Sequence, residues 1–273
     1  MRHLRAFVAV ADEESFTYAA SVLHLTQPAL SRTIQQLESI LGAKLVERTP
    51  RTFELTELGH GFYARCKRIL GELDRAVQYV QGNSVFRLSF SWLLPSPWAH
   101  ETAARFTEMT GMKVSFVRCD DAAAVLRRGE AEAVVVRSGQ PGWDLEGVDL
   151  FEEPRVLVCS RRSPLARRES VAWEEVPRWT LVINTFNGTT QPSLWPKAEQ
   201  LSVVETTNYD EWLESVAAGA GIGVIPEIGA RNAHPELRFV PLTGAPPVLV
   251  RLVFAAHTSR TTRRDFLAAA VQR

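Results

Sequence analysis

The chain has 273 residues with 31 basic and 31 acidic side chains, 45% hydrophobic and 23% charged residues. This length allows two or three modest domains, and this composition is ordinary for a globular protein. Because the net charge is zero, overall attraction to nucleic acid is excluded, and any contact with DNA must come from a local cluster of side chains.

The sequence gives no sign of a membrane or secreted protein. No apolar run approaches the roughly 18 residues that a membrane helix needs, and the start lacks a signal-peptide cleavage site. Cys66, Cys119 and Cys159 are far apart and odd in number, which argues against a disulfide framework. We therefore expect the cytoplasm of a prokaryote.

Three short helices are predicted at the start of the chain. Apolar spacing indicates a helix over residues 4–14, and Ser15 or Thr17 can cap a second helix over residues 18–23. Residues 24–26 suffice only for a turn before a third helix over residues 27–41, which Gly42 ends. The pattern predicts a helix-turn-helix.

The third predicted helix has one apolar and one polar face. Leu30, Ile34 and Leu37 recur at helical spacing, whereas Arg32 and Gln35 project the opposite way. Its N-terminal amides attract phosphate, and Gln and Ser side chains can read base edges. Taken alone, the pattern also fits an ordinary amphipathic surface helix. The residues expected to contact DNA are Thr26, Gln27, Pro28, Ala29, Ser31, Arg32 and Gln35.

Two alternating stretches, residues 44–48 and 52–55, predict a hairpin around the turn Thr49-Pro50-Arg51. Arg48 and Arg51 would lie at its tip. A hairpin so placed can bring an arginine to a phosphate or a minor groove.

One long helix is predicted from residue 56 to about residue 81. Its apolar residues alternate four- and three-residue steps, which is typical of a coiled-coil seam; these are Phe62, Cys66, Ile69, Leu73, Ala76 and Val80. The alternative is a helix packed on its own domain. Gly82-Asn83-Ser84 is the best domain boundary.

These first sixty residues resemble the winged helix-turn-helix of bacterial LysR-type transcriptional regulators. The resemblance lies in Phe16-Thr17-Tyr18-Ala19-Ala20, Leu23-His24-Leu25-Thr26-Gln27-Pro28-Ala29-Leu30-Ser31, Leu41-Gly42, Leu45-Val46-Glu47-Arg48 and Leu55-Thr56-Glu57-Leu58-Gly59. Thr33 departs from the family's usual Gln and would border the outward face, so operator preference would differ. The resemblance implies dimerisation through the long helix, a homodimer or dimer of dimers, and association with the nucleoid.

The remainder alternates predicted strands and helices. Strands are expected at residues 86–90, 113–117, 133–136, 155–159, 179–183, 222–226, 237–242 and 248–256, and helices at 98–109, 121–128 and 209–218, with a short amphipathic tail at 262–271. This order predicts an α/β fold with a parallel sheet covered on both faces. By the same resemblance, this part is a periplasmic-binding-protein-like effector domain with two subdomains.

The expected domain organisation follows. Residues 1–58 form the winged helix-turn-helix domain, residues 59–84 the linker and dimerisation helix, and residues 85–273 the effector-binding domain. Subdomain I takes residues 85–160 and 247–273, and subdomain II residues 161–246.

No motif predicts catalysis, a metal site or a cofactor. Gly219, Gly221 and Gly223 follow a predicted helix and open a strand, whereas a dinucleotide-binding turn follows a strand and opens a helix. The six histidines show no metal-ligand spacing, and no Gly-x-Ser-x-Gly elbow occurs.

A ligand in such a fold lies beyond the carboxyl ends of the strands, between the two units. The residues at those ends are Ser91, Trp92, Cys119, Asp120, Arg137, Thr185, Phe186, Asn187, Thr207 and Asn208. They suit a small polar or carboxylate-bearing effector, with Arg137 as the anion clamp and Thr185 as an orienting donor. Arg137 could equally pair with Glu152 or Glu153.

The sequence therefore predicts a DNA-binding transcriptional regulator whose promoter binding is modulated by a small effector in this cleft. The main alternative is a solute-binding protein or metabolic α/β enzyme with a helical N-terminal appendage. A third possibility is a regulator whose cleft has lost its ligand.

Overall fold

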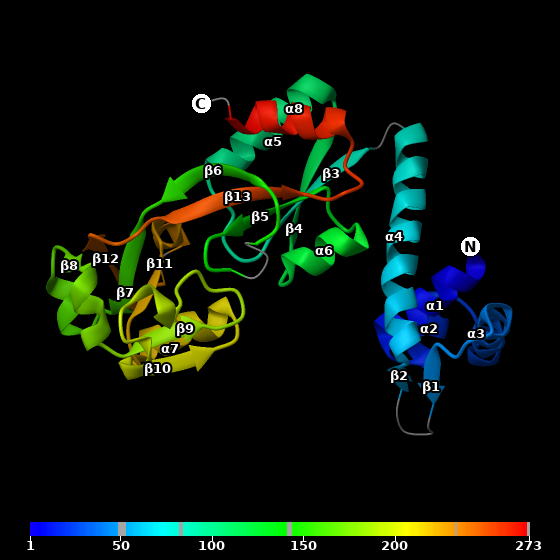
Figure 1. Ribbon diagram of the computed structural model, residues 1–273, viewed down its shortest axis with the longest axis horizontal. Coiled ribbons are helices and arrows are strands. Elements are labelled where there is room, and N and C mark those ends of the chain that lie inside the picture. The colour runs from blue at the N-terminus through cyan, green and yellow to red at the C-terminus, as the bar shows by residue number, and fades with distance from the viewer. Residues whose placement is uncertain (49–52, 82–83, 141–143, 233, 272–273) are drawn as a thin grey trace. The chain divides into compact units, whose positions relative to one another are not determined.

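The structure is a computed structural model that describes residues 1–48, 53–81, 84–140, 144–232 and 234–271 (Figure 1). It divides into an N-terminal unit, Met1–Ser84 with Arg127–Glu130, and a C-terminal unit, Val85–Leu126 with Ala131–Arg273. No helix among the described residues is long and apolar enough to cross a membrane.

The N-terminal unit is a winged helix-turn-helix followed by a long helix. It contains α1 (Arg2–Glu13), α2 (Phe16–Val22), α3 (Gln27–Leu41), the antiparallel hairpin β1 (Val46–Arg48) and β2 (Phe53–Leu55), and α4 (Glu57–Val80). The Thr26 hydroxyl accepts a hydrogen bond from the Ala29 amide at 3.4 Å, and Gly42 ends α3 with φ +66°. These observations confirm the predicted start and end of this helix.

The first lobe of the C-terminal unit is built on a five-stranded sheet in the order β4-β3-β5-β13-β6. The strands are β3 (Val85–Phe90), β4 (Lys113–Arg118), β5 (Ala133–Arg137), β6 (Val148–Glu153) and β13 (Val248–Phe254). One face packs against α5 (Trp98–Thr110) and α8 (Arg260–Val271), which lie side by side in Figure 1. The other face packs against α6 (Ala122–Arg128).

This sheet is mixed, which corrects the expected parallel sheet. β3 pairs in parallel with β4 and β5, but β13 runs antiparallel to β5 and to β6. The reason is connectivity: β6 leads out to the second lobe and β13 returns from it, so neither strand arrives through a helical crossover.

The second lobe has its own four-stranded sheet in the order β11-β7-β12-β8 and a parallel pair, β9 and β10. Its strands are β7 (Arg155–Ser160), β8 (Val171–Ala172), β9 (Leu181–Asn184), β10 (Val203–Thr206), β11 (Gly223–Pro226) and β12 (Leu237–Thr243). Its helix is α7 (Tyr209–Ala218), and its 3-10 turns are η1 (Pro164–Arg167), η2 (Trp173–Arg178), η3 (Pro192–Leu194), η4 (Ala198–Gln200) and η5 (Glu227–Asn232).

β7 corrects the expected division between the lobes. The sequence predicts it in the first lobe, but it pairs with β11 and β12 of the second. The chain crosses at Pro154, between β6 and β7, and returns between β12 and β13. Two crossings join the lobes and make the hinge.

The glycines near residue 220 have structural roles. Gly219 ends α7 with φ +88°, and a Cβ on Gly223 would lie 1.9 Å from Cζ2 of the Trp212 ring. They let a helix turn tightly into a buried strand, as the sequence suggested.

Candidate functional site

The outward face of α3 is exposed and polar. Leu30, Ile34 and Leu37 are buried in the core of the N-terminal unit, whereas Arg32 and Gln35 are exposed. The other residues expected to touch DNA, Thr26, Gln27, Pro28 and Ala29, are also exposed, and Ser31 is half-buried. All seven therefore lie along one helix, with five of their side chains at or near its N-terminal end.

Thr33 corrects an expectation. It is buried, and its hydroxyl donates to the Ala29 carbonyl at 3.0 Å. Since it faces the core, it does not border the outward face of α3. Of the hairpin arginines, Arg51 lies outside the described residues, and only the backbone of Arg48 is described, at the end of β1.

Glu38 positions the hairpin against α3, which the sequence did not suggest. Its buried carboxylate accepts hydrogen bonds from the Leu45 amide at 2.9 Å, the Val46 amide at 3.2 Å and Lys44 Nζ at 2.7 Å. Burial raises the pKa of Glu38, but these three donors outweigh it, so the pKa lies below its ordinary value. The sequence signal that could have indicated this role is a glutamate on the apolar face of a predicted helix.

The predicted seam of α4 divides into two parts. Phe62 and Cys66 pack into the core of their own unit, with the Phe7 and Phe62 rings 5.4 Å apart, so these two residues are wrongly placed in a dimer seam. Ile69, Leu73, Ala76 and Val80 are exposed along one stripe, as is Val77. We name Ile69, Leu73, Ala76, Val77 and Val80 the α4 stripe.

In the C-terminal unit, the strand ends of the two lobes meet at a closed cleft. The cleft holds a cavity of about 20 Å³. Trp92 of the first lobe lines it, and its ring stacks on Tyr209 of the second lobe with centroids 5.1 Å apart. The other lining residues belong to the second lobe and are Val182, Ile183, Asn184, Gly188, Thr189, Thr190, Trp212, Val224 and Ile225.

Arg137 is not an anion clamp. It is 1% exposed, and its guanidinium donates to the Glu153 carboxylate at 2.7 and 3.2 Å and to the Leu93 carbonyl at 2.5 Å. The alternative pairing with Glu153 is therefore the one observed. A guanidinium satisfied by a buried carboxylate has no free charge to offer a ligand.

Two other predicted residues, Ser91 and Asn187, are joined through Gln140, which was not predicted. The Gln140 side-chain amide donates to Ser91 Oγ at 3.0 Å and to the Asn187 carbonyl at 2.8 Å. The sequence signal that could have predicted Gln140 is its position, since it is a polar residue three positions after the end of β5.

The remaining predicted residues do not line the cavity. Cys119 packs in the core beneath α6, and the exposed Asp120 pairs with Arg118 at 3.6 Å. Thr185 and Phe186 are exposed, and the Thr185 hydroxyl donates to the Thr206 carbonyl. Thr207 and Asn208 serve the start of α7, where Asn208 accepts from the Glu211 amide and Thr207 donates to the Glu211 carboxylate.

Three buried polar atoms around the cavity have no hydrogen-bond partner among the described residues. They are Trp92 Nε1, Thr189 Oγ1 and the Tyr209 hydroxyl. Each can donate a hydrogen bond, and leaving such a group unpaired costs about 1–3 kcal/mol. Only Trp92 was predicted; Tyr209 directly follows the predicted Asn208, and Thr189 lies two residues after the predicted Asn187.

Arg155 adds a buried positive charge beside these donors. It is 5% exposed and donates to the Pro246 and Thr189 carbonyls and to Thr190 Oγ1, without an acidic partner among the described residues. Burial lowers the pKa of its guanidinium to about 10, so it stays protonated at neutral pH. The cleft thus combines neutral donors with the Arg155 cation, which contacts the lining residue Thr190 and has no acidic partner among the described residues.

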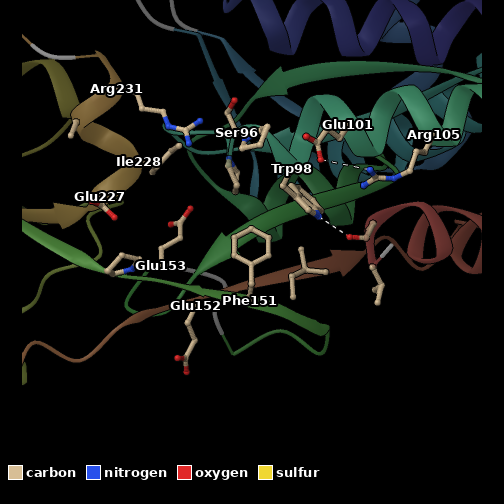
Figure 2. Close-up of a pocket in the computed structure, with 17 residues that line it drawn as sticks. Ser96, Trp98, Glu101, Arg105, Phe151, Glu152, Glu153, Glu227, Ile228 and Arg231 are labelled. Atoms are coloured by element: carbon tan, nitrogen blue, oxygen red, sulfur yellow. Dashed lines mark hydrogen bonds and ion pairs between the residues drawn. The ribbon is translucent and has the colours of Figure 1, made fainter. Parts of the chain in front are cut away.

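A larger groove of about 870 Å³ lies at the hinge side of the two lobes (Figure 2). Trp98, Phe151 and Ile228 give it apolar walls. Its buried polar groups are already bonded: Trp98 Nε1 donates to the Ala270 carbonyl at 2.9 Å, and Glu153 binds Arg137. The groove has the volume of a ligand site, but its described lining residues contribute no unpaired buried donor like those of the cleft.

The described residues contain no group of three or more His, Cys, Asp or Glu side chains that could hold a metal ion.

Comparison with known proteins agrees with this geometry. Residues 1–60 match the family model described as bacterial regulatory helix-turn-helix protein, lysR family, and residues 83–272 match the LysR substrate binding domain. The chain is 27% identical to the Hca operon transcriptional activator HcaR of Escherichia coli K12, over 100% of this chain and 97% of HcaR. It is 49% identical to the regulator BenM of Acinetobacter baylyi over 77 residues, 28% of this chain and 25% of BenM.

The fold is that of full-length CbnR in complex with its target DNA, with a TM-score of 0.75 and 21% identity over 98% of each chain. Neither these relatives nor the family models support a solute-binding protein or metabolic enzyme. The chain belongs to the LysR family of DNA-binding transcriptional regulators, with an N-terminal winged helix-turn-helix and a C-terminal effector-binding domain.

Proposed function

We propose that this regulator binds promoter DNA as a homodimer or a dimer of dimers. Its binding to the promoter changes when a small molecule rich in hydrogen-bond acceptors enters the cleft. The exposed polar face of α3 is the observation that carries the DNA part. Gln27, Arg32 and Gln35 would contact base edges and phosphates. A symmetric pair of winged helix-turn-helix domains suits a DNA site with two half-sites. It would act at the nucleoid in the cytoplasm.

The α4 stripe supports dimerisation. Its five residues are apolar and exposed in a single chain, and an exposed apolar stripe along a helix is stabilised by a second copy of that helix. We propose the α4 stripe as the dimer contact. Phe62 and Cys66 are not part of it, because they pack in the core of the N-terminal unit.

The chemistry of the cleft supports an anionic effector. Among the described residues, Trp92, Thr189 and Tyr209 offer three donors without partners, and the buried Arg155 guanidinium donates to the Thr189 carbonyl at 3.0 Å. A carboxylate accepts several hydrogen bonds and carries the opposite charge. A small carboxylic acid therefore fits the cleft better than a cation or a hydrocarbon.

A gel shift tests the DNA part. The full chain should retain a fragment from upstream of its own gene more strongly than a random fragment of equal length, with affinity falling steeply between 50 and 200 mM salt. A Gln35→Ala variant should lose part of this preference, whereas Gln200→Ala, an exposed glutamine of the C-terminal unit, should not. Equal retention of both fragments by the wild type would contradict the proposal.

A further inference from the structure

Gln140 joins the two lobes beside the cleft, through partners next in sequence to the lining residues Trp92 and Gly188. It belongs to the loop after β5 in the first lobe, is 6% exposed, and accepts a hydrogen bond from the Arg137 amide through Oε1 at 3.0 Å. Its Nε2 donates both to Ser91 Oγ in its own lobe and to the Asn187 carbonyl in the second lobe. Every donor and one acceptor of this amide are used, so its orientation is fixed.

Both ends of this link are held rigidly. Gly139 has φ +87°, and a Cβ there would lie 2.9 Å from the Thr189 carbonyl oxygen, so the two backbones are in close approach. On the other side, the Asn184 side chain donates to Asn187 Oδ1 at 2.7 Å and accepts from the Asn187 amide at 3.1 Å. The Gln140 contact therefore joins two braced loops.

The cavity beside this contact is too small for an effector. At about 20 Å³ it has room for about one water molecule, whereas small-molecule sites occupy roughly 300 Å³ or more. A carboxylic acid can reach Thr189 and Tyr209 only when the lobes separate. Separation lengthens the distance between Gln140 Nε2 and the Asn187 carbonyl, because these atoms belong to different lobes.

We propose that Gln140 is the latch of the cleft: it holds the lobes together, and an effector can enter only after this amide releases the Asn187 carbonyl. This inference rests on the proposed function of the cleft. It makes Gln140 a positioning residue that sets the resting angle between the lobes, and it implies that binding opens them. A ligand that prefers the open arrangement then shifts the population toward it.

Hydrogen exchange measured by mass spectrometry on the full chain tests the latch without any ligand. The variants are Gln140→Leu, which keeps the size but removes the amide, and Gln140→Asn, which keeps the amide but is too short to span the lobes. Gln200→Leu is the matched control, because Gln200 is exposed on η4. Peptides covering residues 88–94 and 184–192 report the two facing loops.

Both Gln140 variants should raise exchange in these two peptides at least tenfold while β5, β7 and α4 keep wild-type protection. Gln200→Leu should change neither. Unchanged exchange in the loops would overturn the latch, and so would a uniform rise through β5 and β7 in both variants, since that shows support of the fold instead. The measurement needs no DNA, so its failure is distinct from failure of the gel shift.

Discussion

The Arg32 guanidinium is exposed on the face of α3 that we assign to DNA. If it binds a guanine with two hydrogen bonds, Arg32→Ala should weaken binding to the operator by about 1–3 kcal/mol and relax the preference for one base. Dissociation constants on operator and random DNA give the measurement. Arg238→Ala, an exposed arginine of the C-terminal unit, is the control. An equal loss on both DNAs would show that Arg32 touches only phosphate.

The Glu38 carboxylate gives a second test at the scale of one residue. Because its hydrogen bonds outweigh burial and lower its pKa in the folded state, its contribution to stability is present above the ordinary carboxyl range and is lost as the pH falls through the lowered pKa. Glu38→Gln should lower the free energy of unfolding of the N-terminal unit by about 1–3 kcal/mol at pH 7. The gap between wild type and variant should narrow steadily in thermal unfolding curves as the pH falls below the ordinary carboxyl range. A gap that stays constant or widens on acidification would contradict this role.

Residue identity alone did not reveal partners. The rule that ligands lie at strand ends predicted Trp92, which lines the cavity, and Ser91 and Asn187, which bind Gln140, yet Arg137 at another strand end is satisfied by Glu153. The partner of a buried charge is decided by packing between segments far apart in the chain. For the same reason Arg155, buried where the chain crosses between lobes, was not foreseen.

At the scale of elements, α3 and α4 followed from periodicity and end signals because helical hydrogen bonds and caps are local. β6 and β10 were missed. β6 carries Asp149, Glu152 and Glu153 and lies at the edge of its sheet, paired with β13 about a hundred residues later. β10 is four residues long, and among the described strands it pairs with β9 alone. Such strands depend on non-local pairing that a short pattern does not encode.

The α4 stripe leads to a prediction at the same scale. Leu73→Glu places a charge in the dimer contact of both protomers, which forfeits about 1.5–3 kcal/mol of burial per chain and should weaken dimerisation at least 100-fold. Sedimentation at micromolar concentration should then show monomers. Ala64→Glu, on the opposite side of α4 and also exposed, should leave the oligomer intact. A Leu73→Glu protein that stays oligomeric would remove the stripe from the interface.

At the scale of the whole molecule, the cleft contains donors that lower the stability of the fold and are available to bind a ligand. Among the described residues, the donors on Trp92, Thr189 and Tyr209 have no partner, which destabilises the closed lobes. An acceptor-bearing ligand that enters the cleft would satisfy them. The proposed effector site therefore predicts a response that a regulator with a silent cleft would not show.

The effect of one of these donors can be measured with Tyr209→Phe. Removing an unpaired buried hydroxyl should raise stability by about 1 kcal/mol, seen as a rise in Tm of about 2–4 °C. In the wild type, a small carboxylic acid that binds should raise Tm by mass action, so a panel of mono- and dicarboxylic acids is screened first. The acid that raises Tm most should bind Tyr209→Phe about tenfold more weakly, because one hydrogen bond is lost.

Tyr18→Phe serves as the control, since Tyr18 is 69% exposed on α2 and its hydroxyl is solvated in the folded and unfolded chain alike. It should alter neither Tm nor the response to the acid. If Tyr209→Phe lowers Tm, the hydroxyl has a partner inside the protein. If the variant keeps the full response to the acid, the ligand binds away from Tyr209, and the large groove beside Trp98 becomes the site to test by the same method.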